Sequence, residues 1–302
     1  MIGEELEFIE WLTKRKLPAP GVEVGIGDDM AVLATSAGRV LVSSDMLLDG
    51  VHFDTTSDDP ALIGRKAIAC SLSDCAAMAV RPVAVTVSVA WPGGLDQADA
   101  RLIFEGMASI AADHDVAIAG GDTTSWNEPM VIDVAITAMP YDGIEPVFRS
   151  GAKAGDTLYV TGRLGGSRLA RHLAFTPRVR EARLAAEGLG SRLHAMIDLS
   201  DGLSLDLSRV CKASGVGAVV DEELIAAVVS DDARRLAAMD GRPPEDHALC
   251  DGEDFELLLA VDGEADVLGA ELLPLGVITG QGLHIARGDG RLELLEPRGY
   301  VH

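Results

Sequence analysis

The stretch from Val24 to Phe53 constrains the chain most, because it places acidic residues at the ends of short apolar runs. Asp28 and Asp29 follow one such run, and Asp45 follows the next. Side chains at strand ends project into loops, where sites are usually built. Two carboxylates about 4 Å apart repel by roughly 1 kcal/mol in water and about 4 kcal/mol at a surface-like dielectric. A cluster of such residues favours a bound hard cation such as Mg²⁺, although turn and cap residues explain this stretch alone equally well.

Composition narrows the class of protein. The 302 residues are 48% hydrophobic, which suits one large or two ordinary domains with a real core. There are 25 Lys and Arg against 48 Asp and Glu, a net charge of −23. This balance argues against binding to nucleic acid or to an anionic membrane. An anionic small substrate stays compatible with the charge, provided that cations screen the site.

The cysteines, the first residues and the hydropathy of the chain indicate in which cellular compartment the protein works. The four cysteines form no C-x-x-C pair and lie in apolar surroundings, so we expect reduced, buried thiols. The first residues are acidic and lack the basic region of a signal peptide. No apolar run approaches the ~20 residues needed to span a bilayer. We therefore expect a cytoplasmic protein without membrane contact.

Periodicity predicts an α/β (α+β) chain of two halves. The first half should hold helices at 4–16, at 58–81 and at 96–112, and strands at 30–34, 39–44, 83–90, 116–119 and 130–139. The turn at 141–143 is the first plausible boundary, which gives domains 1–140 and 141–302. The second half should hold strands at 157–161, 195–198, 217–220 and 255–261, and helices at 167–174, 178–190 and 203–213.

Aspartates from both halves form a recurring pattern. Four of them end short apolar runs, and a fifth lies inside an apolar helix: Asp29, Asp45, Asp122, Asp198 and Asp74. Their spread suggests convergence on one centre. Oxygen ligands without His or Cys select Mg²⁺, Mn²⁺ or Ca²⁺ over zinc, and the spacing of a Ca²⁺ loop is missing. Mg²⁺ held by carboxylates, with few basic residues, points to phosphoryl transfer with substrate phosphates completing the shell.

The common nucleotide-binding signatures do not occur in the sequence. There is no G-x-x-x-x-G-K-[ST], H-R-D or D-F-G, and Gly25-Ile-Gly27 lacks the third glycine of a dinucleotide fingerprint. A P-loop protein and a protein-kinase fold are therefore excluded.

The motifs taken in order resemble the thiamine-monophosphate kinase family, within the aminoimidazole-ribonucleotide synthetase-like superfamily. The resemblance covers nearly the whole chain. It is carried by Gly3-Glu-x-x-x-Phe8-Ile9, Gly25–Asp29, Ser43–Asp45, Gly50–Phe53, Lys66-Ala67, Ser73–Met78, Gly120–Thr123, Arg149–Ala152, Ile197–Gly202 and Gly252–Leu257. Each motif is weak alone, and together they are specific. Gly50–Phe53 and Ser73–Met78 favour this family over its sister enzymes.

The resemblance implies an activity and a set of site residues. The family transfers the γ-phosphoryl group of ATP to thiamine monophosphate by direct in-line attack, without a phosphoenzyme. Its two domains are an N-terminal mixed-sheet domain for ATP, Mg²⁺ and dimerisation and a C-terminal α/β domain, and it forms homodimers. Several Mg²⁺ ions would be held by Asp29, Ser43, Ser44, Asp45, Asp74, Asp122, Asp198 and Asp201. ATP would be contacted by Gly121, Asp122, Arg149 and Ser200, and the thiamine substrate by His52, Glu253 and Tyr300.

The sequence departs from the family pattern at a few positions. Asp113-His114 replaces an aromatic pair near the adenine, and Asp251 replaces a glycine beside Glu253. Ser44 replaces a threonine but keeps the hydroxyl. The family's His-x-x-Pro-x-Pro-Arg survives only as His172, Pro177 and Arg178.

Two alternatives stay open at this point. A sister synthetase of the same superfamily would use ATP with another acceptor, of the purine-biosynthesis or selenophosphate type. A non-catalytic acidic scaffold would bind metal without turning over ATP. The number of metals and a requirement for K⁺ stay open as well.

Overall fold

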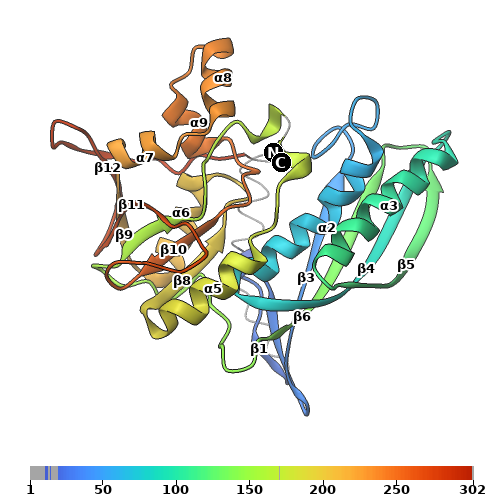
Figure 1. The fold of residues 1–302 in the computed structure, drawn as a ribbon, viewed down its shortest axis with the longest axis horizontal. Helices are drawn as coiled ribbons and strands as arrows, with labels where there is room; N and C mark the ends of the chain where they lie inside the picture. Colours follow the sequence, from blue (N-terminus) through green and yellow to red (C-terminus); the bar gives the residue numbers. More distant parts are fainter. Residues whose placement is uncertain (1–10, 13, 15–19, 170, 301–302) are drawn as a thin grey trace. The chain divides into compact units, whose positions relative to one another are not determined.

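The computed structural model describes residues 11–12, 14, 20–169 and 171–300. The helix expected at 4–16, and the motif at 3–9, fall largely or wholly outside the described residues. The chain divides into two compact units (Figure 1). The first is formed mainly by Met1–Cys75 and Val80–Tyr141, and the second by Ala76–Ala79 and Asp142–Tyr300. The α/β expectation with two halves is confirmed.

The first unit is built on a six-stranded sheet with the order β1-β2-β3-β6-β4-β5. The strands are β1 (Val22–Val24), β2 (Ala31–Thr35), β3 (Gly38–Leu48), β4 (Val80–Pro92), β5 (Ala117–Trp126) and β6 (Val131–Pro140). Every neighbouring pair is antiparallel except β4 and β5, which run parallel. The parallel pair needs a crossover, which the helix between β4 and β5 supplies.

Two helices, α2 (Pro60–Ala77) and α3 (Gln97–Asp113), pack together over one face of this sheet (Figure 1). Both helices begin where the sequence predicts, with Asp96 accepting a hydrogen bond from the backbone N–H of Ala98. They cross closely at two glycines: a Cβ on Gly64 would lie 1.8 Å from the carbonyl oxygen of Ile103, and one on Gly106 would lie 1.9 Å from that of Ala61. Only glycine allows this approach, so the crossing fixes α2 against α3.

The second unit is built on a seven-stranded sheet with the order β13-β12-β9-β11-β7-β10-β8. The strands are β7 (Thr157–Val160), β8 (Leu193–Asp198), β9 (Gly217–Asp221), β10 (Leu257–Val261), β11 (Leu273–Thr279), β12 (Leu283–Ala286) and β13 (Leu292–Leu294). Only β12 and β9 are parallel. The short, wholly buried β10 lies between β7 and β8, which places the chain just before it beside the end of β8.

The helices of the second unit pack on this sheet and build its core. They are η1 (Ser167–Leu169), α4 (Arg171–Ala174), α5 (Val179–Leu189), η2 (Gly190–Arg192), α6 (Leu203–Ser214), α7 (Glu222–Val228), α8 (Asp231–Asp240) and α9 (Pro244–Cys250). Leu203, Leu207 and Val210 lie at the 3.6-residue spacing that buries one side of α6. They pack in one cluster with strand residues such as Leu158 and Ile197.

Four sequence-based expectations about elements and their ends are corrected by the structure. Asp45 lies inside β3, and Gly120–Thr124 lie inside β5, although both were expected to follow strand ends. Strand pairing explains the second difference, because β5 stays paired with β4 as far as Trp126 after a bulge at Ala119. The helix expected at 167–174 is split into η1 and α4. The strand expected from 255 begins at Leu257.

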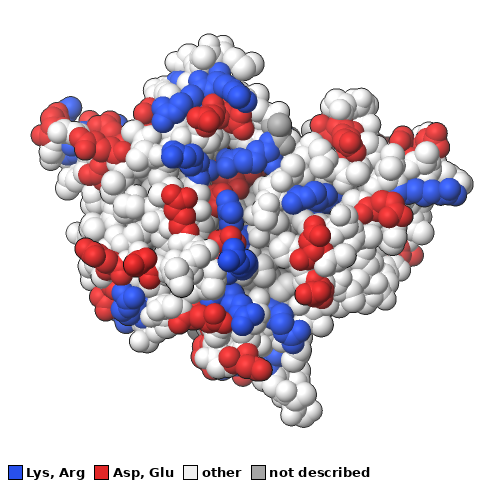
Figure 2. Space-filling view, in the orientation of Figure 1, with Lys and Arg blue, Asp and Glu red and all other residues white. Residues whose placement is uncertain are grey.

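The acidic balance of the sequence does not give one uniformly acidic surface. Figure 2 shows Asp and Glu interspersed with Lys and Arg on the face that it draws. Exposed pairs such as Arg287 with Glu222 and Glu293 illustrate this mixing. Among the described residues, no helix combines the length and the apolar character needed to cross a membrane.

Candidate active site

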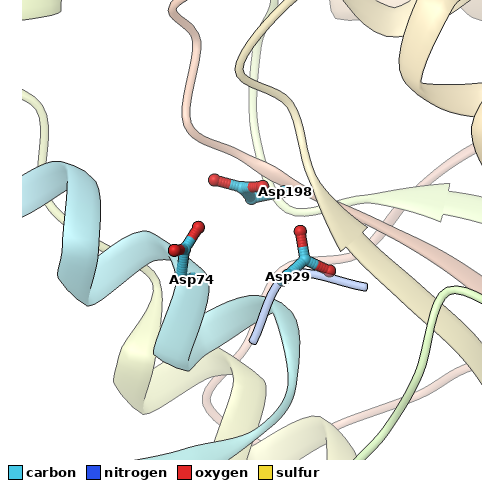
Figure 3. Close-up of side chains that lie close together, drawn as sticks. All are labelled: Asp29, Asp74 and Asp198. Carbon is cyan, nitrogen blue, oxygen red and sulfur yellow. The ribbon is translucent and has the colours of Figure 1, made fainter. Parts of the chain in front are cut away.

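Two predicted metal ligands of the first unit lie side by side. Asp74 is in the last turn of α2, and Asp29 is in the loop that leads into β2. A carboxylate oxygen of each lies within 4.8 Å of the other, and Asp29 is only 8% exposed (Figure 3). Two anions held this close raise each other's energy, and a divalent cation between them would reverse the sign of that term. A bound divalent cation would therefore explain why Asp74 lies within the otherwise apolar helix α2.

The hydroxyl and carboxylate groups of β3 continue the polar site. The Ser71 hydroxyl of α2 donates a 2.6 Å hydrogen bond to Asp45, and the Ser44 hydroxyl donates one of 2.9 Å to Asp133 on β6. Burial raises the pKa of Asp45 to about 6, against the Ser71 hydrogen bond, with Asp133 and Asp29 adding repulsion. The Ser43 Oγ is buried and has no hydrogen-bond partner among the described residues.

Asp133, which the sequence analysis did not single out, lies beside two proposed metal ligands: it accepts the Ser44 hydrogen bond and repels Asp45. It lies opposite Met46 and one residue from the register of Asp45, in an otherwise apolar strand. A single carboxylate in the alternating run Val131–Met139 is the signal that could have drawn attention to it. Its distance in sequence from Ser44 hides the hydrogen bond between them.

Asp122 and Gly121 lie on β5, at one edge of the first sheet. Asp122 is exposed, and its carboxylate accepts a hydrogen bond of 2.8 Å from the backbone N–H of Thr123. In register, Asp122 faces Ser88 of β4, which faces Asp133 of β6. Neighbouring strands are about 4.8 Å apart, so two strand spacings separate Asp122 from Asp133. The convergence of Asp122 with the other aspartates therefore stays a prediction.

The predicted residues of the second unit gather around the loop between β8 and α6. Asp198 is the last residue of β8 (Figure 3), and Ser200 and Asp201 follow it. The backbone N–H of Glu253 donates to the carbonyl oxygen of Ser200 at 2.6 Å, and that of Tyr300 donates to the carbonyl oxygen of Asp201 at 2.7 Å. Backbone hydrogen bonds thus bring three distant segments of the sequence to one place.

Asp201 is held by a cation that the sequence did not reveal. Arg209 of α6 contacts Asp201 at 2.5 Å and the buried Asp206 at 2.6 Å. Asp206 also accepts hydrogen bonds from the backbone N–H groups of Asp201 and Gly202. Burial raises the pKa of Asp206 to about 7, with Arg209 opposing the shift. The spacing of Asp206 and Arg209, three residues apart on a helix, is the sequence signal for this pair.

The segment that carries Glu253 has an unusual backbone. Glu253 and Phe255 have φ values of 54° and 50°, a region that costs free energy for residues with a Cβ. Neighbouring contacts hold it: Phe255 stacks on Phe175 with 4.0 Å between ring centroids, and Asp254 pairs with Arg171 at 2.7 Å. Glu253 itself lies 3.4 Å from His172. Strain of this kind, imposed by its surroundings, is typical of a ligand-binding segment.

Contacts with other residues of the second unit hold Tyr300 in place. The Arg168 guanidinium lies over its ring, 4.6 Å from the centroid. Ser204 holds Arg298, two positions before Tyr300, donating to its carbonyl oxygen at 2.6 Å and accepting from its N–H at 3.1 Å. Arg149 has its carbonyl oxygen within 3.3 Å of the Ser214 hydroxyl, and its charge acts on Asp206.

Comparison with known proteins fixes the family. Residues 27–140 match the N-terminal domain of AIR synthase related proteins, and residues 153–271 match the C-terminal domain. A thiamine-monophosphate kinase from Rhodopirellula baltica is 37% identical over 99% of this chain and 97% of its own length. The chain belongs to the thiamine-monophosphate kinase family.

Other members support the assignment. The thiamine-monophosphate kinase of Synechococcus elongatus is 33% identical over 91% of this chain and 90% of its own length. The solved structure of AaThiL complexed with AMPPCP and TMP has a TM-score of 0.82 at 25% identity, covering 98% of this chain and 95% of that one. The resemblance inferred from the motifs is thus confirmed.

Proposed function

We propose that this member of the family transfers the γ-phosphoryl group of ATP to thiamine monophosphate, giving thiamine diphosphate and ADP. The observation that carries the proposal is the carboxylate pair of Asp29 and Asp74, in a chain that matches thiamine-monophosphate kinases from end to end. AMPPCP, an ATP analogue, and TMP are the two ligands of the related AaThiL complex. The acceptor phosphate attacks directly in line, and no side chain becomes phosphorylated.

The donor set fits Mg²⁺. Asp29 and Asp74 offer oxygens within 4.8 Å of each other, and Ser43 offers a buried hydroxyl oxygen that has no partner among the described residues. Hard cations of this kind prefer carboxylate and hydroxyl oxygens. The remaining members of the proposed set are Ser44, Asp45, Asp122, Asp198 and Asp201. When bound, Mg²⁺ supplies positive charge that offsets the repulsion between two phosphorylated reactants.

The remaining residues have distinct proposed roles. Gly121, Arg149 and Ser200 contact ATP together with Asp122, and His52, Glu253 and Tyr300 contact the thiamine substrate. The strained segment at Glu253 and the Arg168–Tyr300 contact support the substrate roles, because both hold a side chain in place before a ligand arrives. Residues 1–140 form the proposed domain for ATP, Mg²⁺ and dimerisation, and residues 141–302 form the C-terminal α/β domain.

A homodimer is part of the proposal. The helices α2 and α3 cover one face of the first sheet, and the opposite face exposes Met46, Thr86, Ser88, Asp122 and Thr124. The edge strand β5 is exposed along nearly its whole length. A second copy would cover this open face with the same surface. Light scattering should give twice the chain mass of 31.6 kDa, and Thr86→Lys, which adds a charge to the face, should return the mass to one chain.

The cytoplasm is the proposed compartment. None of the four cysteines, all in the described part of the chain, is in a disulfide. Reduced thiols are usual where ATP is abundant and the environment is reducing.

Incubation with ATP, Mg²⁺ and thiamine monophosphate tests the proposal, with chromatographic detection of thiamine diphosphate, with and without K⁺. Product that depends on all three supports it. Absence of product would overturn it. ATP hydrolysis that requires a different acceptor would favour a sister synthetase, and metal binding without any ATP turnover would favour a scaffold.

A further inference from the structure

Backbone hydrogen bonds within residues 48–53 hold the turn that carries His52. The carbonyl oxygen of Leu48 accepts hydrogen bonds from the N–H of Val51 at 3.2 Å and of His52 at 2.9 Å. Gly50 donates to the carbonyl oxygen of Phe53 at 2.7 Å. The turn directly follows β3, the strand that holds Ser43, Ser44 and Asp45. His52 is therefore fixed to the strand that supplies proposed metal ligands.

The imidazole ring of His52 is oriented as well. The backbone N–H of Leu48 donates a 2.9 Å hydrogen bond to Nδ1 of His52. A ring nitrogen that accepts carries no proton, so the neutral ring bears its proton on Nε2. A proton on Nδ1 would face the Leu48 N–H and break this contact. The turn thus selects one tautomer, in which Nε2 can only donate.

Lys66 holds the same turn from the side of α2. Its side chain is 0% exposed, and Nζ donates a 2.7 Å hydrogen bond to the carbonyl oxygen of His52. Burying an ammonium group is costly, so fully buried lysines are rare and are paired or hydrogen-bonded. Lys66 lies two turns before Asp74 on one continuous helix. The helix therefore links the carboxylate pair to the His52 turn.

We propose that Lys66 is a positioning residue: it clamps the turn so that His52 presents Nε2–H as a donor to an acceptor atom of the thiamine substrate. This inference rests on the proposed function for the identity of the substrate. It assigns no contact between Lys66 and a ligand. Lys66 acts through the His52 carbonyl, and the Leu48 amide fixes the tautomer.

The test compares Lys66→Met, which keeps the length and removes the ammonium, with Lys212→Met at an exposed position of α6. ¹⁵N NMR of the imidazole, assigned with His52→Gln, should show a single Nε2–H tautomer in the unaltered protein. Lys66→Met should show exchange between tautomers and raise KM for thiamine monophosphate about tenfold, as expected for one lost hydrogen bond to the substrate. KM for ATP should change less than about twofold. Lys212→Met should match the unaltered protein in every measurement.

An Nδ1–H tautomer in the unaltered protein would overturn the inference, as would unchanged spectra and KM in Lys66→Met. If Lys66→Met does not fold, His52→Gln and His52→Asn decide instead. The amide nitrogen of glutamine reaches the position of Nε2, whereas that of asparagine reaches only Nδ1. We expect glutamine to stay within about threefold of the original KM and asparagine to raise it about tenfold. Equal KM values for the two would contradict the proposal. If no thiamine diphosphate forms at all, the proposed function fails, while the spectrum of His52 still tests the role of Lys66.

Discussion

The backbone N–H of Tyr300 donates a 2.7 Å hydrogen bond to the carbonyl oxygen of Asp201. The bond ties a proposed thiamine-binding residue to a proposed metal ligand almost a hundred positions earlier in the chain. Ser204 strengthens the link through its two hydrogen bonds with Arg298. The segment that carries Tyr300 is thus held beside Asp201, and we expect substitutions of Tyr300 to weaken binding of the thiamine substrate.

Tyr300→Ala should raise KM for thiamine monophosphate about tenfold, because the ring stacked under Arg168 is lost. Tyr300→Phe keeps the ring and should stay within about twofold. Steady-state kinetics with each substrate varied in turn measure both. An alanine variant with the original KM would show that the ring does not contact the thiamine substrate.

Asp74→Asn should lower turnover by at least about a hundredfold and weaken Mg²⁺ binding, because a carboxylate ligand is replaced by an amide. Without metal, the Tm should stay the same or rise, since the repulsion with Asp29 disappears. Calorimetric Mg²⁺ titration, turnover assays and thermal melts measure these effects. The matched control is Asp113→Asn, at an exposed carboxylate of α3. Unchanged Mg²⁺ affinity in Asp74→Asn would contradict the metal assignment.

Asp254 should make stability depend on pH. Burial raises its pKa from 3.8 to about 7, against Arg171, Ser167 and the Gly165 amide. Between these values the unfolded chain has lost the proton and the folded chain keeps it. The contribution to the free energy of unfolding is therefore complete below 3.8 and falls by about 1 kcal/mol per pH unit up to about 7.

Asp254→Asn should remove this slope, and urea unfolding at a series of pH values measures the difference from the unaltered protein. Asp262→Asn, at an exposed carboxylate, is the control and should leave the slope in place. If the free energy of unfolding depended on pH in the same way in Asp254→Asn and in the unaltered protein, the raised pKa of Asp254 would be contradicted.

Gly106→Ala should destabilise the first unit, because its Cβ would lie 1.9 Å from the carbonyl oxygen of Ala61. Overpacking of this kind costs about 1–3 kcal/mol or more. Ser109→Ala, an exposed position on the same helix, should change the free energy of unfolding by less than about 0.5 kcal/mol. Equal unfolding curves for the two variants would show that α2 and α3 separate at little cost.

Much of this molecule can be predicted from local patterns. Apolar spacing and the Asp96 cap predict α3, and Pro60 marks the start of α2, because helix signals lie within a few residues of each other. The end of α2 was predicted too late, since the helix stops at Ala77 and Pro82 lies inside β4. The residue types of the metal set also follow from the sequence. Acids at the ends of apolar runs are recognisable without knowing what they meet, as Asp198 at the end of β8 illustrates.

The sequence by itself determined the family, the residue types of the proposed ligands and the positions of helices such as α3 and α6. Only the tertiary structure decided which groups meet: Asp133 with Ser44, Arg209 with Asp201 and Asp206, and Lys66 with His52. It also placed Asp122 inside an edge strand rather than after the end of a strand. The physical reason is that strand pairing and buried ion pairs join residues far apart in sequence. The local spacing of apolar residues carries no information about which distant residue becomes the partner.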